Sequence, residues 1–306
     1  MNASNDMDTD EYPVSSSQTD VLSPQVTSTA VQVDLAALSH QGKVRPNNED
    51  HFLVVRFNRA LHTLLTNLPE GLIPLRAEEV GYGLVVADGM GGMAAGEVAS
   101  RLAIRTLINL ALATPDWVLR GGGSEIERVM QRMAERYRRV DVALRAEAQA
   151  DPNLSGMGTT MTLACSLGAD LILGHVGDSR AYLLSSGALH LLTRDHTLVR
   201  ELVDRGVVRA EQAAKHPLRH VLTQALGGRG EMEAELQRVS LADEDQLLLC
   251  TDGLTDMVDS TTIGAILRSS ASSQDACQTL VELALQKGGK DNVTVVLARY
   301  RFAHEP

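Results

Sequence analysis

The stretch "GYGLVVADGMGG" (residues 81–92) runs from an apolar, strand-like segment into Asp88, and glycines follow at once. Apolar runs elsewhere end in a similar way near Asp178 and at Asp252, while Asp291 stands just before the last apolar run. A single strand that ends in Asp-Gly is typical of a turn. Four carboxylates at the ends of strand-like segments instead predict one shared site.

The chemistry of these side chains favours hard divalent cations. Mg²⁺ and Mn²⁺ prefer oxygen ligands, whereas zinc is disfavoured because no His or Cys stands at the corresponding positions. Crowded carboxylates without a metal would repel one another, and two cations would neutralise them. Two metals about 3.5–4 Å apart lower the pKa of a bridging water and hold a phosphoryl group. The glycines after Asp88 would let a backbone carbonyl approach such a metal.

A second polar cluster, "GKVRPNNEDHF" (residues 42–52), contains Arg45, Glu49 and Asp50. A guanidinium beside a metal site is suited to bidentate phosphate binding, and the two acids could hold metal-bound waters. The alternative interpretation is a polar turn with a surface salt bridge. This cluster alone does not decide between the two.

The composition argues against several classes of protein. The 306 residues carry a net charge of −11, which argues against nucleic acid or an anionic membrane as the main partner. The three cysteines are far apart in the chain, so we expect reduced thiols. No apolar run is long enough to span a bilayer, and the N-terminus lacks the pattern of a signal peptide. We therefore expect a cytoplasmic protein, and a monomer.

The chain divides into two parts. Residues 1–33 are acidic, rich in Ser and Thr, and contain no Lys or Arg. Such a segment cannot bury enough apolar surface to offset its ordering entropy, so we predict a disordered tail. No internal repeat or second linker follows, which predicts a single domain over residues 34–303. Within it, residues 55–80 are longer than a simple hairpin requires, and we interpret them as a lid or a docking insertion.

Periodicity predicts the elements of this domain. Strand patterns cover residues 34–42, 50–57, 81–88, 158–167, 170–177, 245–252 and 292–302, with a hairpin over 180–193. Helix patterns cover residues 96–113, 124–150, 196–206 and 273–289. Short turns between strands predict mostly antiparallel sheets, and strands that are apolar on both faces must be covered on both sides. We predict an α+β fold, a four-layer α/β/β/α sandwich of two mostly antiparallel sheets flanked by helices.

Six motifs in order carry a family resemblance: "RPNNED", "VADGMGG…GEVAS", "GMGTT", "GDSRAYLL", "LLLCTDGLTD" and "GGKDNVTVV". Together they closely resemble the metal-dependent protein phosphatases of type 2C, in the bacterial serine/threonine branch. The resemblance covers about residues 34–300. Each motif is weak alone, because Asp-Gly pairs are common, but six in the family's order are specific.

The resemblance implies a role for each acidic residue. Asp88 would bridge two Mn²⁺ or Mg²⁺ ions, and the carbonyl of Gly89 would bind the second. Asp252 and Asp291 would complete the shell of the first ion. Asp178 resembles the family's position for a possible third ion, shared with Asp252.

The resemblance also implies the reaction. Arg45 would bind the substrate phosphate, and Glu49 and Asp50 would act on the metals mainly through waters. A metal-bridging water would hydrolyse phosphoserine or phosphothreonine in phosphorylated proteins, opposing a bacterial Ser/Thr kinase. Residues 199–217 match the bacterial flap beside the site. Two alternatives stay open: a catalytically silent regulator of the same fold that binds a phosphoprotein or kinase, and a switch phosphatase acting on an anti-sigma-factor antagonist.

The source of a catalytic proton is left open by the sequence. Many eukaryotic members of the family have His where this chain has Met90, and Met cannot donate a proton. By position, the candidates are His51, His196, His216 and His220. His175 lies inside an apolar strand, so we interpret it as a buried, hydrogen-bonded core residue.

Overall fold

The computed structural model describes residues 31–302, apart from residues 70, 74, 92–94, 114–122, 214, 229 and 231. Residues 1–30, where most of the predicted tail falls, lie outside the described residues. The first strand, β1 (Val31–His40), begins earlier than the expected domain start at residue 34. In the described part of the chain, no helix is both long and apolar enough to cross a membrane.

Two antiparallel sheets form the centre of the molecule. The first sheet has the order β1, β11 (Val293–Phe302), β10 (Gln246–Cys250), β7 (Arg180–Ser185) and β8 (Ala188–Leu191). The second has the order β2 (Asp50–His62), β3 (Arg76–Met90), β5 (Met161–Leu167), β6 (Asp170–Val176) and β9 (Glu235–Ser240), and β4 (Gly158–Thr159) pairs with β3. Every pairing within these sheets is antiparallel, as the short connections predicted.

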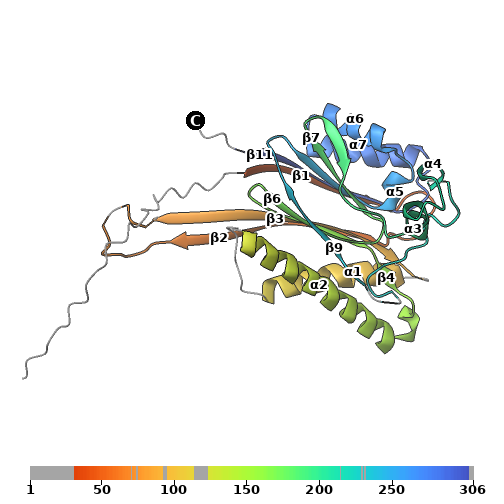
Figure 1. Cartoon of the computed structure of the whole chain (residues 1–306), viewed down its shortest axis with the longest axis horizontal. Coiled ribbons are helices and arrows are strands. Elements are labelled where there is room, and N and C mark those ends of the chain that lie inside the picture. Colours follow the sequence, from red (N-terminus) through yellow and green to blue (C-terminus); the bar gives the residue numbers. More distant parts are fainter. Residues whose placement is uncertain are drawn as a thin grey trace, which may run out of the picture.

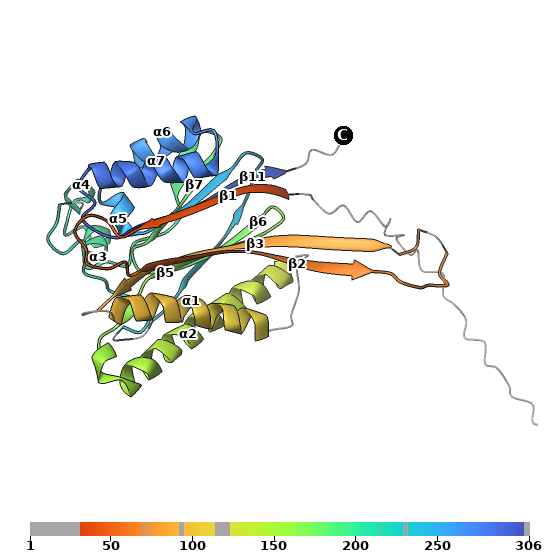
Figure 2. The same ribbon diagram turned by 180° about the vertical axis from the view of Figure 1, so that it is seen from behind.

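Helices cover the outer face of each sheet (Figures 1 and 2). The helices α1 (Ala95–Ala113) and α2 (Gly123–Ala150) lie on the second sheet, and α6 (Ser260–Ser269) and α7 (Ser273–Gln286) lie on the first. The remaining helices are the 3-10 turn η1 (Pro152–Leu154), α3 (Leu198–Asp204), α4 (Ala210–Ala213) and α5 (Asp252–Thr255). The predicted four-layer α/β/β/α sandwich is confirmed.

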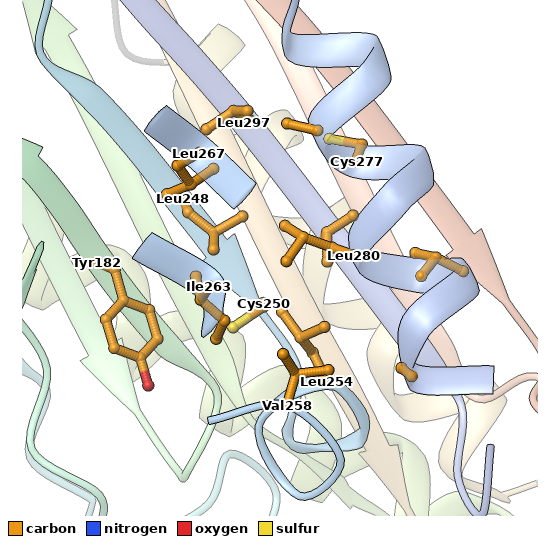
Figure 3. Packing of buried hydrophobic residues seen from close by; sticks show 14 of the residues in the cluster. Tyr182, Leu248, Cys250, Leu254, Val258, Ile263, Leu267, Cys277, Leu280 and Leu297 are labelled. Atoms are coloured by element: carbon orange, nitrogen blue, oxygen red, sulfur yellow. The ribbon is translucent and has the colours of Figure 1, made fainter. Parts of the chain in front are cut away.

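The apolar runs are continuous because their strands are buried on both faces. In β10, Leu248 and Cys250 pack toward α6 and α7 (Figure 3), whereas Leu247 and Leu249 pack between the sheets. Successive side chains of "QLLLC" still point to opposite faces of the sheet. Because both faces are buried, apolar and polar residues do not alternate in this segment. Cys250 and Cys277 are buried free thiols whose pKa is raised to about 12 by burial.

Among the elements missed from the sequence are β9 and α6. The strand β9 is an edge strand of alternating polarity, "ELQRVS", with four charged or polar side chains among its six residues, so it lacks an apolar run. The helix α6 has only ten residues and carries Thr and Gly, which weaken its helical pattern. Residues 55–80, interpreted as a lid or docking insertion, continue β2 and β3 into a long hairpin with a connecting loop.

The core position of His175 is confirmed. Its Nδ1 lies 2.9 Å from the hydroxyl of Thr162, and its Nε2 lies 3.0 Å from the carbonyl oxygen of Gly177. Since that carbonyl can only accept, Nε2 carries the proton and Nδ1 accepts from Thr162. Burial, with a smaller effect from the neighbouring His196, lowers the pKa of His175 to about 3.

This buried histidine predicts a pH-dependent stability. In the unfolded chain His175 binds a proton below about pH 6.5, but in the folded chain it stays neutral down to about pH 3. The contribution of His175 to the free energy of unfolding is therefore complete above about pH 6.5. It is lost as pH falls below this value, by about 1.4 kcal/mol per pH unit. We expect the unfolding free energies of wild type and His175→Gln, measured in urea from pH 7 to 4, to converge as pH falls. Parallel curves would contradict the assignment.

Candidate functional site

The site begins where β2 and β3 end next to each other. Asp50 and Asp88 are directly opposite in the β2–β3 register; Asp50 is buried and Asp88 is half-buried. Burial and the nearby Asp252 and Asp291 raise the pKa of Asp50 to about 7. The pKa of Asp88 is also raised, first by burial and then by repulsion from Asp50 and the other aspartates. Two strand ends thus hold carboxylates that repel each other.

Close packing of glycines holds the chain at this point. A Cβ on Gly89 would lie 2.1 Å from the carbonyl oxygen of Gly96 and 2.8 Å from that of Glu49. A Cβ on Gly96 would lie 2.7 Å from Oε2 of Glu49. Only glycine at both positions lets the first turn of α1 meet the end of β3, with the Glu49 carboxylate beside them.

The first sheet contributes Asp252 and Asp291 from adjacent strand ends. Asp252 opens α5 directly after β10, and Asp291 precedes β11, which pairs with β10. The two sheets are linked at this point by Thr251, whose hydroxyl donates a 2.8 Å hydrogen bond to Oδ2 of Asp50. The predicted convergence of carboxylates therefore follows from strand pairing within each sheet and one hydroxyl bridge between them.

Arg45 lies beside these acids. Its Nη2 is 2.5 Å from Oδ2 of Asp291, and its side chain is 52% exposed. The hydrogen bond that Arg45 donates to Asp291, with smaller effects from Asp252 and Asp88, raises the pKa of the guanidinium. The predicted cluster at residues 42–52 is thus not a self-contained polar turn, because its arginine pairs with a carboxylate at the far end of the sequence.

Asp178 extends the site toward a cavity. One ligand atom each from Asp178, Asp252 and His220 lie within 4.8 Å of one another. These residues line a cavity of about 400 Å³, which is also lined by residues of the predicted flap, including Val199, Arg200, Val203, Ala210 and Ala213. The flap residues therefore border the acidic site, as the sequence predicted.

Of the candidate histidines, His220 reaches the aspartates. Its Nδ1 is 3.4 Å from Oδ2 of Asp252 and its Nε2 is 3.2 Å from Oδ2 of Asp256, and the hydrogen bond to Asp252 raises the pKa of His220. The other candidates have other partners. His51 pairs with Ser100, His196 accepts from the backbone of Gly177, and His216 accepts from Leu218. Met90 packs against Gly158, where a Cβ would lie 2.7 Å from its Cε.

Asn292 was missed by the sequence reasoning. This residue, only 6% exposed, accepts a 2.8 Å hydrogen bond from the backbone of Glu49. Its amide donates to the carbonyl oxygens of Gln41 and Asn47 at 2.8 and 2.9 Å. One amide therefore fixes the loop that carries Arg45 and Glu49. The motif "KDNV" contained this residue, but its role depends on contacts distant in sequence.

The donor set fits hard cations. Oδ1 of Asp50 is buried with no hydrogen-bond partner, which is costly for a carboxylate oxygen. Asp88 and Asp178 are half-buried next to other carboxylates, and the pKa of each is raised. Such a group of oxygens gains most from divalent cations and offers no thiolate to softer metals.

Comparison with known proteins agrees with this geometry. A family model described as Protein phosphatase 2C matches residues 75–288. The chain belongs to the protein phosphatase 2C family. The serine/threonine phosphatase stp of Listeria monocytogenes is 38% identical over 214 residues, which cover 70% of this chain and 82% of that protein. The resemblance inferred from the six motifs is thereby confirmed.

Solved structures give the same result for this member of the protein phosphatase 2C family. The crystal structure of the Mycobacterium tuberculosis serine/threonine phosphatase PstP/Ppp is similar with a TM-score of 0.71 and 37% identity, covering 88% of this chain and 99% of that one. A structure of the PstP catalytic domain in complex with two manganese ions has a TM-score of 0.69 and 35% identity, covering 89% of this chain and 99% of that one.

Proposed function

We propose that this chain is a metal-dependent protein serine/threonine phosphatase that hydrolyses phosphoserine and phosphothreonine. The observation that carries the proposal is the group of buried and half-buried, mutually repelling aspartates with an unpartnered Oδ1 on Asp50 and a guanidinium beside them. The relatives named as phosphatases support the same reaction. The alternative of a catalytically silent regulator is not favoured, because every predicted metal-binding aspartate is present.

The position of each residue suggests its role in metal binding. Asp88 lies near carboxylates of both sheets and would bridge two Mn²⁺ or Mg²⁺ ions. Asp252 and Asp291 would complete the coordination shell of the first ion, and the carbonyl of Gly89 would bind the second. Asp178 would bind a third ion. Glu49 and Asp50 would act on the ions through waters. When bound, such ions supply positive charge that activates water and neutralises phosphate. The packing of Gly89 on Gly96 orients its carbonyl.

Arg45 would orient the phosphoryl group. Its guanidinium is exposed on one side and held by Asp291 on the other, so donors remain for a phosphate. The 400 Å³ cavity beside Asp178 and Asp252 would receive side chains next to the phosphorylated residue. We further propose that the substrates are cytoplasmic phosphoproteins and that the opposing enzyme is a cognate Ser/Thr kinase. Comparing candidate phosphoproteins in one assay would separate this from a dedicated anti-sigma-factor-antagonist switch.

The basic test is metal-dependent release of phosphate from a phosphothreonine peptide. We expect turnover with Mn²⁺, none after chelation, and recovery when Mn²⁺ is added back. Calorimetry with Mn²⁺ separates the alternatives, since a silent regulator without metals would show neither heat of binding nor turnover. Absence of turnover with Mn²⁺ bound would refute the phosphatase assignment.

Replacing Arg45 tests phosphate binding. We expect Arg45→Ala to lower kcat/KM for the phosphopeptide by about 10–100-fold, because hydrogen bonds to charged groups contribute about 1.5–3 kcal/mol. Arg45→Lys should lower kcat/KM by a smaller factor, since lysine keeps the charge but lacks the planar guanidinium that binds phosphate through two hydrogen bonds. Stability should change little, because the Arg45–Asp291 pair is largely exposed. Arg139→Ala, at an exposed ion pair on α2, is the control. Equal kinetics for Arg45→Ala and the control would rule out this role.

A further inference from the structure

The β2–β3 hairpin extends beyond the body of the molecule as an arm, which we define as residues 58–80. Pairing runs from Asn58↔Val80 to His62↔Arg76, and the backbone of Thr63 donates to Leu75 at 2.9 Å. In both views the arm projects past the helices that cover the second sheet (Figures 1 and 2). An isolated two-stranded ribbon is marginally stable in water, so an arm of this kind is expected to have a partner.

The tip of the arm is apolar and exposed. The loop at residues 63–75 carries leucines that are 48–95% exposed: Leu64, Leu65, Leu68, Leu72 and Leu75. A concentration of exposed large apolar side chains marks a binding surface. The loop contains Glu70 but no Lys or Arg. An anionic membrane would favour basic residues at this place, so a protein partner fits the charge better.

A complementary cavity lies at the base of the same hairpin. It has a volume of about 330 Å³ between the second sheet and the helices α1 and α2, and its lining includes Val55, Phe57, Leu107 and Met133. Arg56, Arg132 and Arg136 also line it. An apolar cavity with arginines suits an apolar tip that carries an acidic residue and no basic one.

We propose that the partner is a second copy of this chain, joined by exchange of the two arms across a two-fold axis. Among the described residues no strand pairs with the outer edge of β2, which is the terminal strand of its sheet. Two such edges can pair antiparallel, and identical strands do so around a two-fold axis. With the axis at Ala60, residues 64 and 65 of one copy lie opposite residues 56 and 55 of the other. Each tip then reaches its partner's cavity.

Sedimentation of the full chain over a concentration series tests the dimer. We expect a dimer for wild type and a monomer for Leu64→Asp/Leu65→Asp, with unchanged circular dichroism and unchanged hydrolysis of p-nitrophenyl phosphate. Val142→Asp, at a residue on α2 that is 64% exposed, is the control and should stay dimeric. A monomeric wild type, or a dimer that the double variant leaves intact, would overturn the proposal and return the chain to the monomer expected from the sequence.

Cysteine cross-linking tests the position of the axis. Ala60 and Thr66 are both exposed, so either can be replaced by cysteine without disturbing the core. Under mild oxidation Ala60→Cys should form a covalent dimer, because the axis brings the two copies of residue 60 together. Thr66→Cys should not, because the tips point to opposite ends. Cross-linking of Thr66→Cys but not Ala60→Cys would indicate tip-to-tip contact and refute arm exchange.

Discussion

Replacing Asp88 with alanine is expected to reduce Mn²⁺-dependent phosphate release by more than about 10³-fold. Removal of one group that stabilises a transition state typically costs about 10²–10³ in rate, and Asp88 would contact both ions. The measurement is steady-state turnover of a phosphothreonine peptide at saturating Mn²⁺. Asp170→Ala is the matched control, since Asp170 also stands at a strand end but pairs with Arg238 away from the site. The control should keep wild-type turnover.

The stability of the Asp88 variant should move in the opposite direction. Without metal, Asp88 is half-buried and repelled by Asp50, Asp252 and other carboxylates. Asp88→Asn removes a repelling charge, so its melting temperature in chelator should equal or exceed that of wild type. Added Mn²⁺ should raise the melting temperature of wild type much more than that of the variant, by linkage of binding to folding. A variant that is both inactive and less stable in chelator would point to a structural role for Asp88 instead.

The acidic site could be predicted because its parts are local. An apolar run that ends in Asp-Gly identifies a strand end, and antiparallel neighbours bring such ends together, as Asp50 and Asp88 show. The glycine after Asp252 is also required by close packing, here against a residue distant in sequence, because a Cβ there would lie 1.9 Å from the carbonyl oxygen of Asn292. The layers followed from strands that are apolar on both faces.

Other features depend on contacts that a single sequence does not reveal. His216 and His220 were equivalent by sequence position, but His220 contacts Asp252 because of how the segment after the flap returns to β10. The segment that contains the arm was interpreted as a lid or a docking insertion, because the spacing between Asp50 and Asp88 gave length but not direction. Its pairing continues β2 and β3 away from the acids, which only the register shows.

Asn292 provides a second test of the site. It is not a proposed metal ligand, but it holds the loop that carries Arg45 and Glu49. We expect Asn292→Ala to lower the free energy of unfolding by about 2–4 kcal/mol, because it leaves the backbone N–H of Glu49 and two carbonyl oxygens without their partner. Turnover should fall by about 10–100-fold, as is usual when a group that orients ligands is lost. Urea unfolding and peptide kinetics measure the two effects. Asn153→Ala, at an exposed residue, should change stability by less than about 0.5 kcal/mol.

Asn292→Asp separates hydrogen bonding from side-chain size at this position. Aspartate can still accept from Glu49, but it places an oxygen where the amide donated to Gln41 and Asn47. It also adds a negative charge next to Asp291, so we expect it to be at least as unstable as Asn292→Ala in chelator. If only lost volume mattered, the near-isosteric aspartate would behave as wild type. That outcome would mean that the loop carrying Arg45 and Glu49 is held by other contacts, because the donors of Asn292 are what the aspartate removes.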